Sequence, residues 1–164
     1  MDIYFIRHGI AAEPSEYEYD RDRPLTAKGR EKTARIAQKI RQIGVNFNVI
    51  LTSPLVRAKQ TAQILLEVGL SNLVEDFIPL SPGGNLQEFL QTWSESDYGK
   101  TEGAIALVGH QPDLTDWAEQ LIWAEIREKL ILKKAGIIGL SVPSIASPLG
   151  QCQLFLLTSP KWFD

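Results

Sequence analysis

Six short apolar runs recur along the chain, and most of the stretches between them have helical spacing. The runs cover Asp2–Arg7, Asn48–Thr52, Leu73–Ile78, Ala104–Val108, Ile137–Val142 and Gln153–Leu157. Runs of this length that are rich in β-branched and aromatic residues are typical of buried strands. Strands that alternate with helices in this way favour βαβ units. The pattern therefore predicts an α/β fold with a mostly parallel sheet.

The predicted helices begin at residues that commonly cap a helix. Thr26 is a typical N-cap residue. Ser53 as an N-cap, followed by Pro54 at the first helical position, predicts the start of a second helix. Asn85 and the Pro112–Asp113 pair mark two further starts. No internal repeat, low-complexity segment or linker divides the chain, so residues 1–164 are expected to form one domain.

Composition narrows the class of protein. The formal net charge is −3, from 17 Lys and Arg against 20 Asp and Glu, which argues against a nucleic-acid binder. The one cysteine, Cys152, allows no internal disulfide, and it is expected to be a buried strand residue. No apolar stretch approaches the roughly 18 residues of a membrane span, and no cleavable signal is evident. We therefore expect a cytoplasmic protein with neither nucleic acid nor membrane as a partner.

The two histidines of the chain occupy equivalent places. His8 and His110 each lie just beyond a predicted buried strand, and each is next to a glycine, Gly9 and Gly109. In open α/β sheets, ligands bind in the crevice beyond the carboxyl ends of the strands. A single histidine is more often structural than catalytic. Two titratable side chains at one edge of a sheet instead indicate a shared site.

Arginines accompany both ends of this predicted site. Arg7 directly precedes His8, and its guanidinium fork suits phosphate or carboxylate oxygens. Arg57 lies one turn into the helix predicted to start at Ser53, and a helix N-terminus itself attracts anions. Alone, Arg57 would be interpreted as a solvated surface residue. Together these residues indicate an oxyanion site.

Three motifs in this order resemble the histidine phosphatase superfamily, which includes phosphoglycerate mutases and acid phosphatases. They are Arg7-His8-Gly9, then Thr52–Ala58 with Gln60–Ala62, and Val108–Pro112. Within the superfamily, the short chain and the Pro24–Thr26 segment resemble the SixA-type protein phosphohistidine phosphatases. The resemblance implies a phosphoglycerate mutase-like fold, a three-layer α/β/α sandwich around a mixed sheet. It implies no metal and no organic cofactor.

The resemblance also implies a role for each site residue. His8 matches the nucleophile that becomes transiently phosphorylated, and Arg7 and Arg57 match the two arginines that clamp the phosphate. His110 matches the second histidine, which stabilises the transferring phosphoryl group. A nucleophilic imidazole must be neutral, with its other nitrogen held by a backbone carbonyl. These roles require the four side chains to meet around one oxyanion, with both rings accessible from solvent.

The expected substrate is a phosphorylated protein, possible examples being phosphorelay components. The resemblance implies that superfamily enzymes acting on phosphate esters use a carboxylic acid to protonate the leaving alkoxide. The candidates for it by chain order are Glu75, Asp76 and Glu88. Each is better explained as a solvated charge or, for Glu88, a helix cap. An imidazole leaving group needs this proton far less, so the missing acid favours a phosphorus–nitrogen bond. A phosphatase of small phosphate esters is the alternative.

The same residues allow two other functions, phosphate binding without turnover and metal binding, and the chain also carries a possible docking surface. A phosphate-binding module without turnover is disfavoured by the intact histidines, and a metal site by the lack of a third ligand. Basic residues at helical spacing form either a solvated face, with Glu31 pairing with Arg35, or a docking stripe for an acidic phosphoprotein. The stripe comprises Lys28, Lys32, Arg35 and Lys39. The acidic loop of residues 13–23 is expected to border the pocket mouth.

Overall fold

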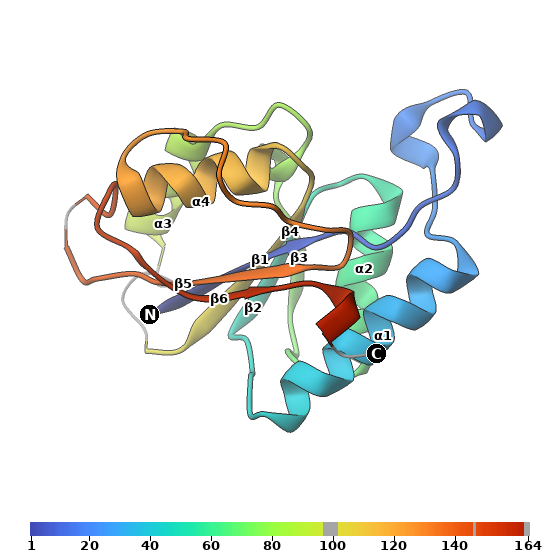
Figure 1. The fold of residues 1–164 in the computed structure, drawn as a ribbon, viewed down its shortest axis with the longest axis horizontal. Coiled ribbons are helices and arrows are strands. Elements are labelled where there is room, and N and C mark those ends of the chain that lie inside the picture. The colour runs from blue at the N-terminus through green and yellow to red at the C-terminus, as the bar shows by residue number, and fades with distance from the viewer. Residues whose placement is uncertain (97–101, 146, 163–164) are drawn as a thin grey trace.

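The computed structural model describes residues 1–96, 102–145 and 147–162 (Figure 1). Its strands are β1 (Asp2–Arg7), β2 (Val49–Thr52), β3 (Val74–Asp76), β4 (Ala104–Gly109), β5 (Ile137–Ser141) and β6 (Gln153–Thr158). Its α-helices are α1 (Ala27–Gln42), α2 (Val56–Glu67), α3 (Leu86–Glu95) and α4 (Asp113–Trp123). Short 3₁₀ turns include η1 (Pro14–Glu16), η2 (Asp20–Asp22), η3 (Ile78–Leu80) and η5 (Pro160–Trp162). Each predicted strand is present, with its ends shifted by at most two residues.

The strands form one mixed sheet in the order β3-β2-β4-β1-β5-β6. The first four are parallel to one another, whereas β5 and β6 are antiparallel to their neighbours. The prediction of a mostly parallel mixed sheet is therefore confirmed. β6 lies at the edge of the sheet and leaves Leu154, Phe155 and Leu157 exposed, so its apolar run is not a buried strand. Cys152 lies just before β6 rather than in it, and burial raises the pKa of its thiol to about 11.

Helices cover both faces of the sheet, which gives three layers (Figure 1). Alternate residues of β1 point to opposite faces, as strand geometry requires. Ile3 and Phe5 pack with α3 and α4, while Tyr4 and Ile6 pack with α1 and α2. The three-layer α/β/α sandwich is confirmed. No helix in the described part of the chain combines the length and apolar character needed to cross a bilayer.

The helix starts agree with the sequence except at α2. Thr26 caps α1 by accepting a hydrogen bond from Gly29, and Asn85 caps α3. The predicted start of α2 at Ser53 is wrong, because the helix begins at Val56 with Leu55 as N-cap. The Ser53 hydroxyl contacts His110 as well as the backbone of Leu55. Its side chain therefore belongs to the candidate site and not to a helix cap.

Strand register aligns the ends that carry the predicted site. Arg7 is level with Gly109 on the neighbouring strand, and Thr52 is level with Val108. The next residues along the three parallel strands are His8, Ser53 and His110. Parallel strands end at the same edge of a sheet, so segments about 50 residues apart in sequence meet there.

A buried carboxylate fixes the loop after α4. Glu119 is fully buried and accepts four backbone hydrogen bonds of 2.5–2.7 Å, from the amides of Arg127, Glu128, Lys129 and Leu130. Burial acts to raise the pKa of Glu119, but these four donors outweigh it and the pKa is lowered. The loop continues to Leu132, whose carbonyl accepts from Arg7. Glu119 thus supports an anchor of the candidate site from a distance.

Glu119→Gln is expected to lower the free energy of unfolding by roughly 2–3 kcal/mol at neutral pH, because the neutral amide cannot satisfy all four donors. The pKa of Glu119 is depressed in the folded state, so its contribution is present above the unfolded pKa and is lost as pH falls through the folded one. Urea unfolding of both proteins from pH 7 to pH 3 would show the difference narrowing. Glu125→Gln, an exposed change in the same loop, is the control. An undiminished difference at pH 3 would contradict this assignment.

Candidate active site

His8 is held as a neutral imidazole with a defined tautomer. Its Nδ1 lies 2.7 Å from the carbonyl oxygen of Gly9. A carbonyl can only accept, so Nδ1 carries the proton, and Nε2 is unprotonated with a lone pair that accepts from Arg57. Burial, followed by the charges of His110 and the arginines, lowers the pKa of His8 to about 3, although the bond to Gly9 opposes the shift. The ring is therefore neutral at physiological pH, as the sequence interpretation required.

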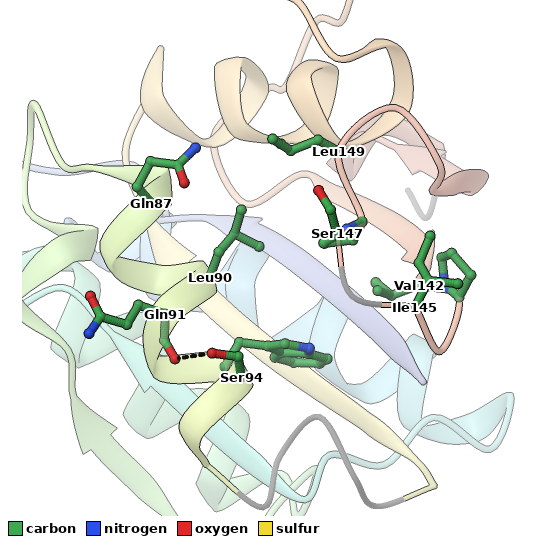
Figure 2. Close-up of a pocket in the computed structure, with 11 residues that line it drawn as sticks. Gln87, Leu90, Gln91, Ser94, Val142, Ile145, Ser147 and Leu149 are labelled. Atoms are coloured by element: carbon green, nitrogen blue, oxygen red, sulfur yellow. Dashed lines mark hydrogen bonds between the residues drawn. The ribbon is translucent and has the colours of Figure 1, made fainter.

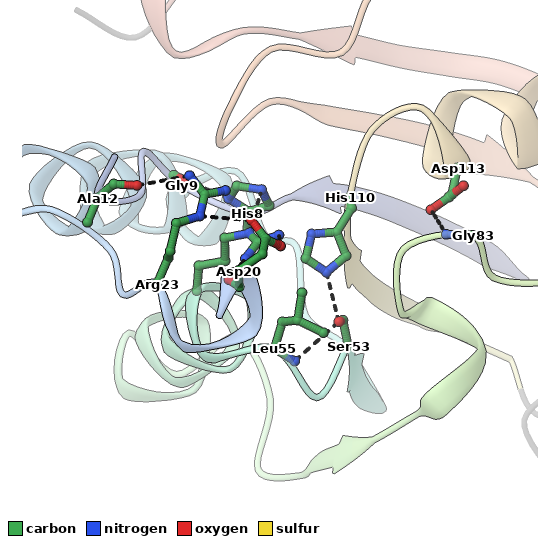
Figure 3. A network of polar contacts seen from close by, with 11 residues as sticks. His8, Gly9, Ala12, Asp20, Arg23, Ser53, Leu55, Gly83, His110 and Asp113 are labelled. Atoms are coloured by element: carbon green, nitrogen blue, oxygen red, sulfur yellow. Dashed lines mark hydrogen bonds and ion pairs between the residues drawn. The ribbon is translucent and has the colours of Figure 1, made fainter. Parts of the chain in front are cut away.

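His110 faces the same space. The two imidazole centroids are 5.2 Å apart with their planes at 55°. Nε2 of His110 is 2.8 Å from the Ser53 hydroxyl, and its Nδ1 is buried without a hydrogen-bond partner among the described residues. Burial and the charge of Arg57 lower the pKa of His110 to about 4. Figure 3 shows both rings in one network of polar contacts.

Arg57 joins the cluster from the first turn of α2. Its Nε donates to His8 Nε2 at 3.3 Å, and its side chain is only 5% exposed. One terminal nitrogen donates to the backbone carbonyl of Asp20 at 2.7 Å and the other to the Asp20 carboxylate at 2.8 Å. Arg57 is therefore not a solvated surface residue. All of its donor nitrogens are engaged in this state.

Arg7 borders the cluster from the end of β1. It donates to the carbonyl of Leu132 at 2.9 Å, and its Nε is buried without a hydrogen-bond partner among the described residues. Its charge contributes to the lowered pKa of both histidines. The structure thus brings all four predicted side chains to one place. Buried polar atoms without partners are rare in folded proteins, so Nε of Arg7 and Nδ1 of His110 each have a hydrogen bond left to make.

The backbone around His8 is fixed by neighbouring elements. The amide of Gly9 donates to Thr61 on α2, and Thr61 in turn donates to the carbonyl of Arg57. A Cβ on Gly9 would lie 2.5 Å from the hydroxyl of Thr33 on α1. Close packing against α1 thus requires glycine here.

The acidic loop reaches the site, and the sequence did not single out the residues that do so. Asp20, from η2, forms ion pairs with Arg57 and, at 2.9 Å, with Arg23 (Figure 3). Burial acts to raise the pKa of Asp20, but hydrogen bonding and charge from Arg57 and Arg23 lower it. The signal available in the sequence was an acidic loop with an arginine directly before Pro24. Composition alone could not tell Asp20 from the four other carboxylates of that loop.

The exposure of the rings differs from expectation. His8 is 6% and His110 is 4% exposed, so neither ring faces open solvent as an accessible site would require. Asp20 lies against Arg57, and η2 packs on α2. A phosphate that binds Arg57 must therefore replace the Asp20 carboxylate. The carboxylates considered from chain order lie elsewhere: Glu75 and Glu88 are exposed, and Asp76 pairs with Lys59 at 2.6 Å.

Asp20→Ala is expected to tighten binding of inorganic phosphate roughly two- to fivefold, because it removes an anion that competes for Arg57. Isothermal titration calorimetry with phosphate or tungstate measures the effect. Asp22→Ala, in the same turn and paired loosely with Arg21 at 3.9 Å, should change nothing. Equal or weaker binding by Asp20→Ala would show that the carboxylate does not compete.

Another pocket lies away from this cluster. Figure 2 shows it between α3 and the segment after β5. Its volume is about 600 Å³. Its lining includes Leu90, Trp93 and Val142, and none of the residues that line it is ionisable. The groups needed for acid–base or nucleophilic chemistry are therefore in the histidine cluster and not in this pocket.

Comparisons of sequence agree with the geometry. Residues 3–78, which include Arg7, His8 and Arg57, match the model of the histidine phosphatase superfamily, branch 1. An uncharacterized protein of Picosynechococcus sp. is 48% identical over 163 residues, covering 99% of this chain and 98% of that protein. A 2,3-bisphosphoglycerate-dependent phosphoglycerate mutase of Actinobacillus pleuropneumoniae is 36% identical over 69 residues, covering 41% of this chain and 30% of the mutase.

Comparisons of structure extend the likeness over the whole fold. The protein histidine phosphatase SixA complexed with tungstate has a TM-score of 0.87 and 21% identity, with 100% of both chains covered. The phosphoglycerate mutase of Bacillus anthracis str. Sterne has a TM-score of 0.74 and 14% identity, with 99% of this chain and 95% of the mutase covered. At these identities the likeness establishes the fold, and it confirms the phosphoglycerate mutase-like class.

Proposed function

The chain belongs to the histidine phosphatase superfamily, and from that premise we propose that it hydrolyses phosphohistidine on proteins through a phosphorylated His8. The observation that carries the proposal is the tautomer of His8. With Nδ1 held by the Gly9 carbonyl, Nε2 presents its lone pair toward Arg57 and the space shared with His110. This is the arrangement that nucleophilic attack on phosphorus requires.

The first step transfers the phosphoryl group to His8. The lone pair of Nε2 attacks phosphorus while the bond from phosphorus to the substrate nitrogen breaks, and that nitrogen keeps the electron pair. Arg7, Arg57 and the free nitrogen of His110 stabilise the negative charge on the equatorial oxygens. Phosphoryl transfer depends mainly on such positioning and charge stabilisation. Water then attacks phospho-His8, which releases inorganic phosphate and a proton and restores the imidazole.

The state of Asp20 supports a nitrogen leaving group. Asp20 is the carboxylate that contacts the cluster among the described residues, and it pairs with Arg23 at 2.9 Å as well as with Arg57. The Arg23 pair, which does not involve the phosphate, also acts to lower the pKa of Asp20. An ionised carboxylate holds no proton to give to a leaving alkoxide. A phosphohistidine whose other ring nitrogen is protonated leaves as neutral imidazole and needs no such acid. This favours protein phosphohistidine, as in phosphorelay components, over phosphate esters.

A substrate panel tests the proposal. Turnover is measured on a phosphohistidine peptide, a phosphoserine peptide and a sugar phosphate at the same concentrations. We expect kcat/KM to be at least about 10²-fold higher for phosphohistidine, since loss of general-acid assistance typically costs that much. Comparable rates on the esters would overturn the leaving-group argument and favour an ester phosphatase. Phosphoenzyme that is acid-labile and base-stable should accumulate on the wild type but not on a His8 variant.

A further inference from the structure

A second cavity, of about 450 Å³, borders the candidate site on its basic side. Its lining comes from four segments that are distant in sequence, and we name it the lysine pocket. Its cationic lining residues are Arg7, Lys32, Lys133, Lys134 and Lys161. The other three are Ile10, Ser159 and Pro160, so no carboxylate lines it.

Backbone contacts fix the lysine pocket next to the nucleophile. Arg7 lines the pocket and also donates to the carbonyl of Leu132, the residue just before Lys133. The amide of Ala135, just after Lys134, lies 3.0 Å from the carbonyl of Arg7 and 3.1 Å from that of His8. The two loop lysines are thus tied on one side to the Arg7 side chain and on the other to the backbone of Arg7 and His8. The lysine pocket therefore shares Arg7 with the candidate site.

The remaining walls bring further positive charge. Lys32 lies on α1 and Lys161 in η5, which packs against α1 near the C-terminal end of the chain (Figure 1). Of the predicted basic stripe, only Lys32 lines the pocket, and Arg35 pairs with Glu31 at 2.6 Å. The Glu31–Arg35 pair agrees with the interpretation of this helix face as solvated.

Within the part of the chain that the structure describes, the charges of the lysine pocket have no counter-ions. The ion pairs among the described residues involve none of its four lysines. The whole chain has a net charge of −3, so this concentration of cations opposes the general trend of the protein. Like charges gathered without partners repel one another, and an anionic ligand relieves that repulsion.

We propose that the lysine pocket binds an acidic segment next to the phosphorylated histidine of a protein substrate. This proposal rests on the proposed function, and it specifies that the preferred substrate is negatively charged next to its phosphohistidine. Carboxylates of the segment pair with Lys133, Lys134 and Lys161. The lysine stems, with Ile10 and Pro160, offer apolar contact to the same segment.

Three probes and one triple variant test the proposal. The probes are a phosphohistidine peptide flanked by glutamates, the same peptide with glutamines, and phosphoramidate. We expect the wild type to prefer the acidic peptide, and added salt to reduce that preference. Lys133→Gln with Lys134→Gln and Lys161→Gln should reduce kcat/KM for the acidic peptide roughly three- to tenfold, leaving phosphoramidate unchanged. The control is Lys28→Gln with Lys39→Gln, on α1 but outside the lining.

Each contrary outcome has its own meaning. Equal wild-type rates on the acidic and neutral peptides would overturn the docking proposal while leaving phosphohistidine hydrolysis intact. The same holds if the triple variant keeps the wild-type kcat/KM for the acidic peptide, or loses as much on phosphoramidate as on that peptide. If the proposed function is wrong, the wild type turns over no phosphorus–nitrogen substrate, which is a different result from those above. The docking proposal is then tested by binding alone. The dissociation constant of an unphosphorylated glutamate peptide is measured for the wild type and for the triple variant. Equal constants would overturn the docking proposal.

Discussion

Replacing His8 by alanine is expected to reduce turnover by roughly 10⁴-fold or more, since loss of a covalent nucleophile removes the whole reaction path. The Nε2 lone pair, which the Gly9 carbonyl orients through Nδ1, has no substitute within the cluster, because Nε2 of His110 is committed to Ser53. Activity on a phosphohistidine peptide and incorporation of radiolabelled phosphate measure the loss. Circular dichroism of the variant should match that of the wild type.

The alanine also removes a buried ring, so a second variant separates catalysis from packing. His8→Asn keeps a polar side chain of similar reach but cannot form a stable phosphorylated nitrogen. We expect it to be as inactive as alanine and closer to the wild type in thermal stability. Substantial turnover by either variant, or acid-labile phosphate trapped on it, would refute the assignment of His8 as nucleophile.

Replacing Arg57 by alanine is expected to lower kcat/KM by roughly 10²–10³-fold, the usual cost of one donor that stabilises charge in the transition state. Arg57 contacts His8 directly and is almost completely buried, so solvent cannot replace its charge. The loss should appear in kcat as well as in phosphate affinity, because the negative charge on the phosphoryl oxygens that Arg57 contacts is largest in the transition state. Steady-state kinetics gives kcat, and competitive inhibition by phosphate gives the phosphate affinity, so the two effects are measured separately.

Arg57→Lys and Arg21→Ala are the matched controls for this prediction. The lysine keeps the charge but loses the fork that reaches both His8 and Asp20, so it should recover only part of the rate. Arg21 lies in the same loop as Asp20 with its side chain 71% exposed, and its removal should have little effect. A wild-type rate for Arg57→Ala would place the phosphate elsewhere.

Much of the fold could be predicted because its signals are local. Alternating strands and helices, with caps such as Thr26, follow from patterns within short segments. The exposed edge strand β6 could not be identified in this way, because its apolar run resembles that of a buried strand. Whether a strand lies at the edge depends on which strands pair, and pairing is a long-range property of the sheet.

The sequence by itself singled out the four residues that meet in the candidate site, since His8, His110, Arg7 and Arg57 stand beside strand ends or in the helix that follows one. Only the tertiary structure decided what surrounds them. Ser53 contacts His110 and does not cap a helix, and Asp20 occupies Arg57. Hydrogen bonds and ion pairs form between atoms brought together by strand register and loop path. The type of a residue and its spacing along the chain therefore do not specify which residue it will contact.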